Sequence, residues 1–177
     1  MYWESAKNSP ERSHRIQTRP GETPQAITLN DMERRLAITL ARAWIKYDDT
    51  INYPDTINGL PPLVNNAEAI GAELAYCRLN NIYPNLNLNG FETHDCILAD
   101  GTKVNVKFSR YTNPNYHLIV QIKKYDTYPD IYALMVGKWP TYRYIGHVPK
   151  HEVIRPERIN RDLPVPAYAY PRKYLQT

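Results

Sequence analysis

Apolar positions recur every three or four residues in the first half of the chain and fall into short, strand-like runs in the second half. The first helical pattern covers residues 28–47, where Thr28 is the expected cap and Asp31 its partner three residues later. Its apolar stripe consists of Leu29, Met32, Leu36, Leu40, Ala43 and Trp44. This spacing predicts an amphipathic helix with one buried face.

A second helix is predicted over residues 66–81, with Asn65 as its N-cap and Glu68 at the position that completes a capping box. Its apolar stripe consists of Ala67, Ile70, Leu74 and Cys77. Because each helical residue turns by about 100°, Glu73 lies about 70° from the centre of this stripe, at its margin. We expect its carboxylate either along the boundary between the helix and a neighbouring sheet or in solvent.

After residue 91 the pattern changes to short runs rich in Ile, Val, Leu and Tyr, which predict β-strands. The predicted strands cover residues 95–99, 103–109, 118–123, 131–136 and 142–148. The dipeptide Asp100-Gly101 is a turn signal between the first two. The run 131–136 shows no polar alternation, which is typical of a strand buried on both faces.

Helices followed by strands indicate an α+β domain, and polar, proline-rich segments flank it. We expect a flexible basic N-terminal arm over residues 1–27, a folded core over residues 28–150 and a Pro/Tyr-rich C-terminal tail over residues 151–177. The chain has 177 residues, of which 42% are hydrophobic and 23% charged, so it can bury the core of one domain.

Composition excludes several classes of protein. No apolar run approaches the roughly 20 residues of a membrane helix, and the N-terminal residues lack the apolar stretch of a signal peptide. We therefore expect an intracellular, cytoplasmic protein without membrane association. Cys77 and Cys96 have no CxxC spacing and the histidines no zinc-ligand spacing, which argues against a zinc site. The 22 basic and 18 acidic residues permit a nucleic-acid partner without requiring one.

The main candidate for chemistry is the predicted hairpin HDCILADGTKVNVKFSR. Successive strand residues point to opposite faces, so Asn105 and Lys107 project from one face of the second strand while the other face is apolar. Asp95 lies on the partner strand, ten residues before Asn105. Glu73 comes from the preceding helix. The sequence thus supplies two carboxylates, an amide and an ammonium group in a fixed order.

This order resembles the PD-(D/E)XK nuclease superfamily, in which an acidic helix residue precedes an Asp that enters a hairpin and an acid-x-Lys motif on the next strand. The resemblance covers residues 66–148. It includes a later buried strand introduced by Asp130, DIYALMVG, and a following strand that ends in IGHVP, as in phage and bacterial members. It implies a restriction-endonuclease-like mixed β-sheet flanked by helices, with residues 28–150 as the nuclease-like core.

The resemblance implies hydrolysis of phosphodiester bonds with Mg²⁺ or Mn²⁺. Hard cations of this kind take oxygen ligands, usually one or two carboxylates. By the family pattern Asp95 is the principal metal ligand, Asn105 is a further ligand, Glu73 helps to hold the water or a second metal ion, and Lys107 is the catalytic lysine. The cation activates a water molecule, and the lysine orients that water and stabilises the transition state.

Asn105 stands where the family pattern has an acidic residue. Its amide oxygen can still ligate a cation, and some members of the superfamily carry Gln there. The site nevertheless has one negative charge fewer, which should weaken metal binding. Three interpretations stay open: a weaker but active site, a family member that has lost catalysis, or an acid-to-amide substitution made to trap a complex.

The proposed site requires Asp95 and Asn105 to share one face of the hairpin. A two-residue turn at Asp100-Gly101 would instead place Asp95 opposite Val106 and direct it away from Asn105. We therefore expect an odd-length loop or a β-bulge in this hairpin. A regular two-residue turn with Asp95 facing the core would exclude the site.

Two functions are consistent with these residues. The first is a phage or bacterial type of metal-dependent DNA endonuclease, expected to act as a homodimer, with helix 28–47 as a candidate interface. Its predicted nucleic-acid contacts are Arg110, Tyr111, Tyr116 and Lys123. The second is a catalytically inactive nuclease-fold protein that binds nucleic acid or protein, with its two terminal segments as interaction arms. Convergence of Glu73, Asp95, Asn105 and Lys107 in one cleft would favour the endonuclease.

Overall fold

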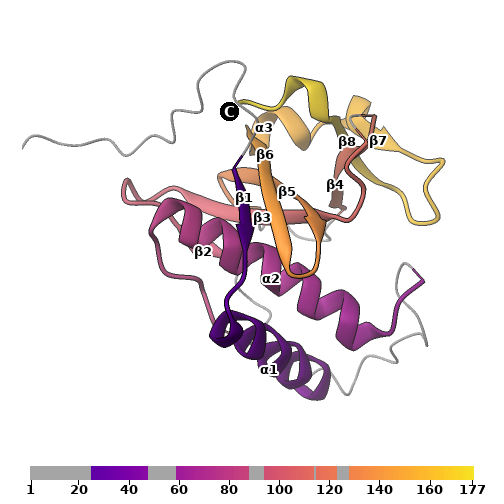
Figure 1. Cartoon of the computed structure of the whole chain (residues 1–177). Helices are drawn as coiled ribbons and strands as arrows, with labels where there is room; N and C mark the ends of the chain where they lie inside the picture. Colours follow the sequence, from indigo (N-terminus) through magenta and orange to yellow (C-terminus); the bar gives the residue numbers. More distant parts are fainter. Residues whose placement is uncertain (1–24, 48–58, 88–93, 114, 123–127) are drawn as a thin grey trace, which may run out of the picture.

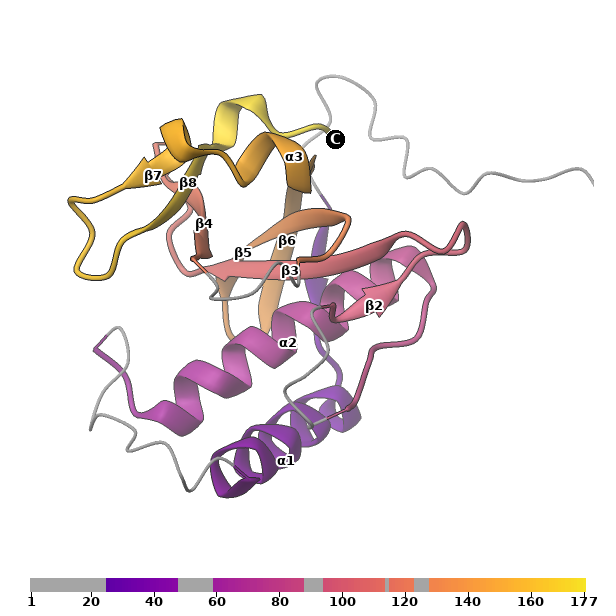
Figure 2. The same cartoon turned by 180° about the vertical axis from the view of Figure 1, so that it is seen from behind.

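The computed structural model describes residues 25–47, 59–87, 94–113, 115–122 and 128–177. Within these ranges the chain forms a mixed α+β fold of stacked layers (Figure 1). Helix α2 (Pro62–Asn80) lies against a five-stranded central sheet, and helix α1 (Asp31–Tyr47) packs on α2. A three-stranded second sheet covers the opposite face of the central sheet (Figure 2). The predicted α+β class is confirmed.

The strand order of the central sheet is β1-β6-β5-β3-β2. Its strands are β1 (Ala26–Thr28), β2 (Cys96–Ile97), β3 (Lys103–Ser109), β5 (Ile131–Lys138) and β6 (Thr141–Pro149). Strands β3 and β5 are parallel neighbours, and the other neighbouring pairs are antiparallel. Between β3 and β5 the chain leaves this sheet to form β4 (His117–Gln121), which belongs to the second sheet.

The second sheet has the antiparallel order β4-β8-β7 and is built largely from the C-terminal segment. The elements of this segment are α3 (Lys150–Val153), the 3₁₀ turn η1 (Pro156–Arg158), β7 (Ile159–Asn160), β8 (Ala167–Pro171) and the 3₁₀ turn η2 (Arg172–Tyr174). Val153 and Tyr170 are buried in the interior. Residues 151–177, expected as a tail, are therefore part of the fold, because their apolar side chains close one face of the central sheet.

The N-terminal prediction is also corrected in part. Residues 26–28 form β1, which pairs with β6, so the end of the expected arm and the start of the expected helix belong to the central sheet. Residues 1–24 of that arm lie outside the described residues. Each of the five predicted strands corresponds to an observed one, although the first, expected over 95–99, is reduced to β2. No helix in the described ranges is long and apolar enough to cross a bilayer.

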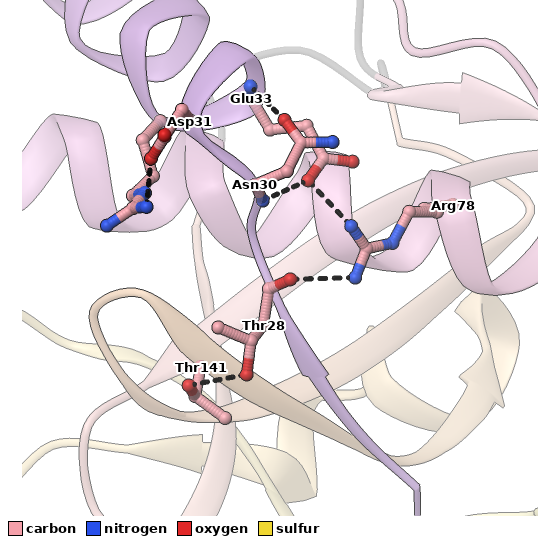
Figure 3. A network of polar contacts seen from close by, with 7 residues as sticks. Thr28, Asn30, Asp31, Glu33, Arg78 and Thr141 are labelled. Atoms are coloured by element: carbon pink, nitrogen blue, oxygen red, sulfur yellow. Dashed lines mark hydrogen bonds and ion pairs between the residues drawn. The ribbon is translucent and has the colours of Figure 1, made fainter.

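Helix α1 begins with a reciprocal capping box between Asn30 and Glu33 (Figure 3). The Glu33 amide donates to Asn30 Oδ1 (2.9 Å), and the Asn30 amide donates to Glu33 Oε2 (2.7 Å). The Arg78 guanidinium of α2 donates to Glu33 (2.7 Å) and to the Thr28 carbonyl (2.9 Å), which ties the β1–α1 turn to α2. The predicted cap at Thr28 is wrong, because Thr28 ends β1 and its hydroxyl bonds to that of Thr141 (2.9 Å).

Helix α2 begins at Pro62 rather than at residue 66, so Asn65 lies inside the helix and is not its cap. Proline suits the first helical position because the amide that it lacks would have no partner there. Gly71 allows α2 to approach the sheet closely, since a Cβ atom at this position would lie 2.5 Å from the Tyr142 hydroxyl. That hydroxyl donates a hydrogen bond to the Glu68 carbonyl (3.1 Å).

Two hydrophobic clusters lie on the two faces of the central sheet, one against α2 and one against the second sheet. Ala133 and Met135 of β5 enter the α2 cluster. Tyr132, Leu134 and Val136 enter the second-sheet cluster. The prediction of a strand buried on both faces is confirmed. The sheet was expected to be flanked by helices; α1 and α2 lie on one of its faces, and the second sheet covers the other.

Candidate functional site

The hairpin of β2 and β3 has the odd-length loop that the predicted site requires. Cys96 pairs with Val104, and the Leu98 amide donates to the Thr102 carbonyl (2.9 Å), which leaves the three residues 99–101 in the loop. The last of these is a glycine with φ of 87°, a conformation that other residues rarely adopt. The expectation of an odd-length loop is confirmed.

Asp95 lies one residue before β2, and its side chain reaches Asn105 on β3. The Val106 amide donates to Asp95 Oδ2 (2.6 Å), and Asn105 Nδ2 donates to Asp95 Oδ1 (3.4 Å). The Asp95 amide donates to the Val104 carbonyl (2.8 Å), and the Asp95 carbonyl accepts from the Asn85 amide (2.7 Å). The Asp95 backbone is therefore held at both its amide and its carbonyl, and its carboxylate is held by the Val106 amide and the Asn105 side chain.

Glu73 comes from α2 and is half-buried beside the hairpin. Burial raises the pKa of its carboxyl well above the usual value because water no longer stabilises the anion, and the negative charge of Asp95 raises it further. The Lys107 ammonium acts in the opposite direction and lowers this pKa. Glu73 therefore shares one electrostatic environment with Asp95 and Lys107, and it holds its proton more tightly than an exposed glutamate does.

Lys107 follows Asn105 by two residues and projects from the same face of β3. It is half-buried, and its Nζ lies 6.0 Å from the centre of the Tyr132 ring. Asp95 and Asn105 meet at the β2 edge of the central sheet. Val104 and Val106 belong to the α2 cluster, so Asn105 and Lys107 project from the other face of β3, toward the second sheet, whereas Glu73 comes from α2. Asp95 and Asn105 are in direct contact, whereas Glu73 acts on Asp95 and Lys107 through its charge.

A narrow crevice of about 30 Å³ opens beside Glu73, between α1, α2 and the segment 84–87. Its walls include the apolar side chains of Leu40, Trp44, Ile70 and Leu74. This volume is close to that of one water molecule in the liquid. The crevice is too small for a nucleotide and has room for water beside Glu73.

The oxygen donors at the sheet edge suit a hard divalent cation in kind, although they are few. Asp95 and Glu73 supply carboxylates and Asn105 supplies an amide oxygen, which are the ligand types of Mg²⁺ and Mn²⁺. The described residues include no group of three or more His, Cys, Asp or Glu arranged to hold a metal ion. A protonated Glu73 is also a poor ligand. The set therefore fits a weakly held Mg²⁺ or Mn²⁺ better than a tightly bound structural metal.

The residues predicted to contact nucleic acid have three different outcomes. Arg110 forms an ion pair through its Nε with the carboxylate of Glu68, which is only 4% exposed. This pairing raises the pKa of Arg110 and gives the side chain a structural role. Tyr111 and Tyr116 stack on each other with ring centres 4.3 Å apart and are 58% and 42% exposed. Lys123 lies outside the described residues.

A second, wider concavity of about 480 Å³ lies on the second sheet and was not foreseen from the sequence. Its polar walls include His117 of β4 and Arg158, Asn160 and Arg161 of the C-terminal segment. Two segments far apart in the chain form it, and one of them was expected to be a tail. The available signal was the regular spacing of Arg155, Arg158 and Arg161.

Comparisons of the chain with protein-family models, with curated proteins and with solved structures find no significant match. The residue pattern and the hairpin geometry therefore carry the functional argument. These residues provide a fixed carboxylate, a second carboxyl with a raised pKa and a neighbouring ammonium. Together they can hold a cation, stabilise an anionic oxygen and move a proton.

Proposed function

We propose that this protein is a divalent-metal-dependent DNA endonuclease with a restriction-endonuclease-like fold, similar to the PD-(D/E)XK superfamily. The observation that carries the proposal is the contact of the Asp95 carboxylate with β3, where it accepts from the Val106 amide (2.6 Å) and from Asn105 Nδ2 (3.4 Å), with Lys107 two residues after Asn105. A two-residue loop would direct Asp95 to the opposite face and separate the charged groups.

The strands around the hairpin support this fold. The segment DIYALMVG forms β5, which lies parallel to β3 and is buried along most of its length. Asp130, just before β5, accepts a hydrogen bond from the Lys103 amide (2.8 Å) and aligns the starts of the two strands. Helix α2 supplies the acidic residue Glu73. The second sheet, in place of a helix on the other face, is a departure from the expected pattern.

Asp95, Asn105 and Glu73 would hold the cation, which supplies an activated water and neutralises charge on the phosphate when it is bound. Asp95 is the fixed member of this set, since its Oδ2 accepts from the Val106 amide at 2.6 Å. Lys107 donates from Nζ to a non-bridging phosphate oxygen and stabilises the charge that develops there.

Glu73 accepts, at its carboxylate oxygens, the proton that the attacking water releases. Its raised pKa makes the carboxylate a stronger base than an exposed glutamate, and the charge of Lys107 acts in the opposite direction. The crevice of about 30 Å³ beside Glu73 has room for one water molecule to pass this proton to solvent.

The test is cleavage of supercoiled DNA in Mg²⁺ or Mn²⁺ by the parent protein, by Lys107→Ala and by Lys103→Ala. Loss of Lys107 should slow cleavage by about 100-fold or more, because it removes the group that stabilises the transition state. Lys103 is an exposed lysine on the same strand, so Lys103→Ala should cleave at the parent rate. Equal cleavage by Lys107→Ala and the parent would contradict the assigned role.

Asn105→Asp restores the acidic residue of the family pattern at the position facing Asp95. It should lower the Mg²⁺ concentration needed for half-maximal cleavage, because a second charged ligand joins the site. If only this variant cleaves DNA, the natural chain is a disabled nuclease.

A second candidate function is a non-catalytic nucleic-acid-binding protein that keeps the fold. Asn105 favours it, because the amide leaves the site with two carboxylates in place of three. No cleavage by the parent, Lys107→Ala or Asn105→Asp in either metal would select this candidate.

The proposal also includes DNA as partner, a homodimer that addresses both strands and an intracellular location. Helix α1 is the candidate dimer interface, since Met32 and Tyr47 near its two ends are exposed. Sedimentation of the parent and of Met32→Glu measures the oligomeric state. A monomeric parent protein contradicts this part of the proposal.

A further inference from the structure

The concavity on the second sheet adjoins the stacked pair Tyr111 and Tyr116. Tyr116 directly precedes His117, which lines the concavity and pairs with Pro171 of β8. Arg172 follows Pro171, and its Nη1 donates to the Thr112 carbonyl (2.8 Å) in the loop between the two tyrosines. The loop that carries the aromatic pair therefore adjoins the residues that line the concavity.

We name this the β4–β8 surface. Its residues are Tyr111, Tyr116, His117, Arg158, Arg161 and Arg172. Alternate residues of β4 are exposed and buried, so His117 lies on the outer side of the second sheet while Leu118 enters the hydrophobic interior. The surface therefore lies on the outer side of the second sheet, whereas the Glu73 crevice lies beyond the central sheet, between α1 and α2.

The arginines at the concavity are available to a ligand. Neither Arg158 nor Arg161 forms an ion pair with a carboxylate of the described residues. The Arg158 guanidinium lies 4.8 Å from the centre of the Tyr170 ring, and its buried Nε has no hydrogen-bond partner within the described part of the chain. Stacking on a ring holds a guanidinium in place while its outer donors stay open.

The charges of this surface suit a polyanion that also carries hydrogen-bonding bases. The cationic side chains in and beside the concavity are Arg158, Arg161 and Arg172. Two carboxylates, Glu157 and Asp162, line the concavity together with Arg158 and Arg161. Guanidinium groups recognise phosphate, whereas carboxylates can accept from the amino groups of bases. A volume of about 480 Å³ falls in the range of small-ligand sites.

We propose that the β4–β8 surface binds single-stranded DNA, with a base stacked on the Tyr111–Tyr116 pair and the adjoining phosphate held by Arg158 and Arg161. An exposed aromatic ring can stack only on an unpaired base, since bases inside a duplex already stack on each other. The proposal deepens the proposed function by naming the form of DNA that is bound, and the choice of DNA rests on that function.

The test is binding of a short fluorescein-labelled oligodeoxythymidylate, measured by fluorescence anisotropy in EDTA, where cleavage cannot occur. Tyr116→Ala should weaken binding about 10-fold, because stacking on one aromatic ring contributes roughly 1–3 kcal/mol per base. Tyr83→Ala is the matched control, since Tyr83 is 82% exposed and lies outside this surface. It should bind as the parent does.

Arg161→Ala should weaken binding and lower the slope of log K against log salt by about 0.7, the value for one phosphate contact to a single strand. Arg161 is exposed, so the substitution should leave the fold intact, and thermal unfolding checks this. Arg42→Ala on α1 is the matched control and should keep the parent slope.

Three results would overturn the proposal: no binding of the single strand, equal or tighter binding of the matching duplex, or unchanged binding by both Tyr116→Ala and Arg161→Ala. Because binding is measured without metal, its failure is separate from failure of cleavage. A protein that binds the single strand but never cleaves DNA would lose the proposed nuclease function and keep this surface.

Discussion

The two faces of the central sheet differ in how deeply their charged groups are buried and in how open they are to water. On the α2 face, Glu73 lies beside a crevice of about 30 Å³ and its pKa is raised by burial. On the second-sheet face, Arg158 and Arg161 border an open concavity of about 480 Å³. The wider space is therefore not where the reactive groups lie.

The difference has a physical cause. Proton transfer benefits from groups whose pKa is shifted, and burial is what shifts it. Recognition of a polymer needs accessible rings and guanidinium groups, which the solvated face of a small sheet provides. Cavity size alone would point to the second sheet as the reactive centre, whereas electrostatics point to the β2 edge.

The largest expected effect tests whether the second sheet belongs to the same folding unit. Leu118→Ala should lower the free energy of unfolding by about 3 kcal/mol, because Leu118 is fully buried between the two sheets. Ile119→Ala on the exposed side of the same strand should cost about 1 kcal/mol or less. Urea unfolding followed by circular dichroism measures both. Similar small losses would mean that the second sheet folds separately from the central sheet.

A smaller effect separates structural from binding arginines. Arg110→Ala should lower the free energy of unfolding by about 2 kcal/mol, because it leaves the Glu68 carboxylate buried without its partner. Oligonucleotide binding should stay close to that of the parent. Adding Glu68→Gln to this variant should recover part of the loss, since the isolated charge is gone. A stable Arg110→Ala that binds DNA poorly would assign Arg110 to the binding surface instead.

The smallest effect concerns pH and the α2 face. The folded-state pKa of Glu73 is raised, so the folded protein binds more protons than the unfolded chain between the unfolded and folded pKa values, and stability falls as pH rises through that window. Glu73→Gln should remove this fall. We expect the free energy of unfolding of Glu73→Gln to exceed that of the parent by more than roughly 0.5 kcal/mol at neutral pH, and by less at about pH 4.

Thermal unfolding across this pH range measures the difference. Asp100→Asn is a useful control, because the pKa of the exposed Asp100 is lowered by its hydrogen bond to the Thr102 amide (3.0 Å). Its contribution to stability is lost as pH falls, opposite in sign to that of Glu73. A difference between Glu73→Gln and the parent that is constant with pH would remove Glu73 from the buried titrating groups.

Local patterns predicted much of the fold and part of the candidate site. The spacing of apolar residues predicted α1, α2 and the strands β2 to β6, and the absence of alternation in β5 indicated burial on both faces. The position of Glu73 at the stripe margin agrees with its half-buried place beside the hairpin. We predicted an odd-length loop because the site requires Asp95 and Asn105 on one face, and the structure has a three-residue loop.

Partners far apart in the sequence were not predictable in the same way. Arginine commonly contacts DNA phosphates, which made Arg110 a candidate, but in the folded protein Arg110 forms an ion pair with Glu68. Thr28 could have capped α1, but it pairs with Thr141 across the sheet and leaves the cap to Asn30. In both cases the partner comes from a distant part of the chain, and it competes for the side chain only after the layers have packed together.

The sequence by itself determined the helices α1 and α2, the strands β2 to β6, and the order of Glu73, Asp95, Asn105 and Lys107 along the chain, because these follow from nearest neighbours and side-chain periodicity. Only the tertiary structure decided that residues 151–177 close the second face of the sheet and that Glu73 retains its proton more tightly. Strand pairing and burial are interactions between distant segments, so no local pattern contains them.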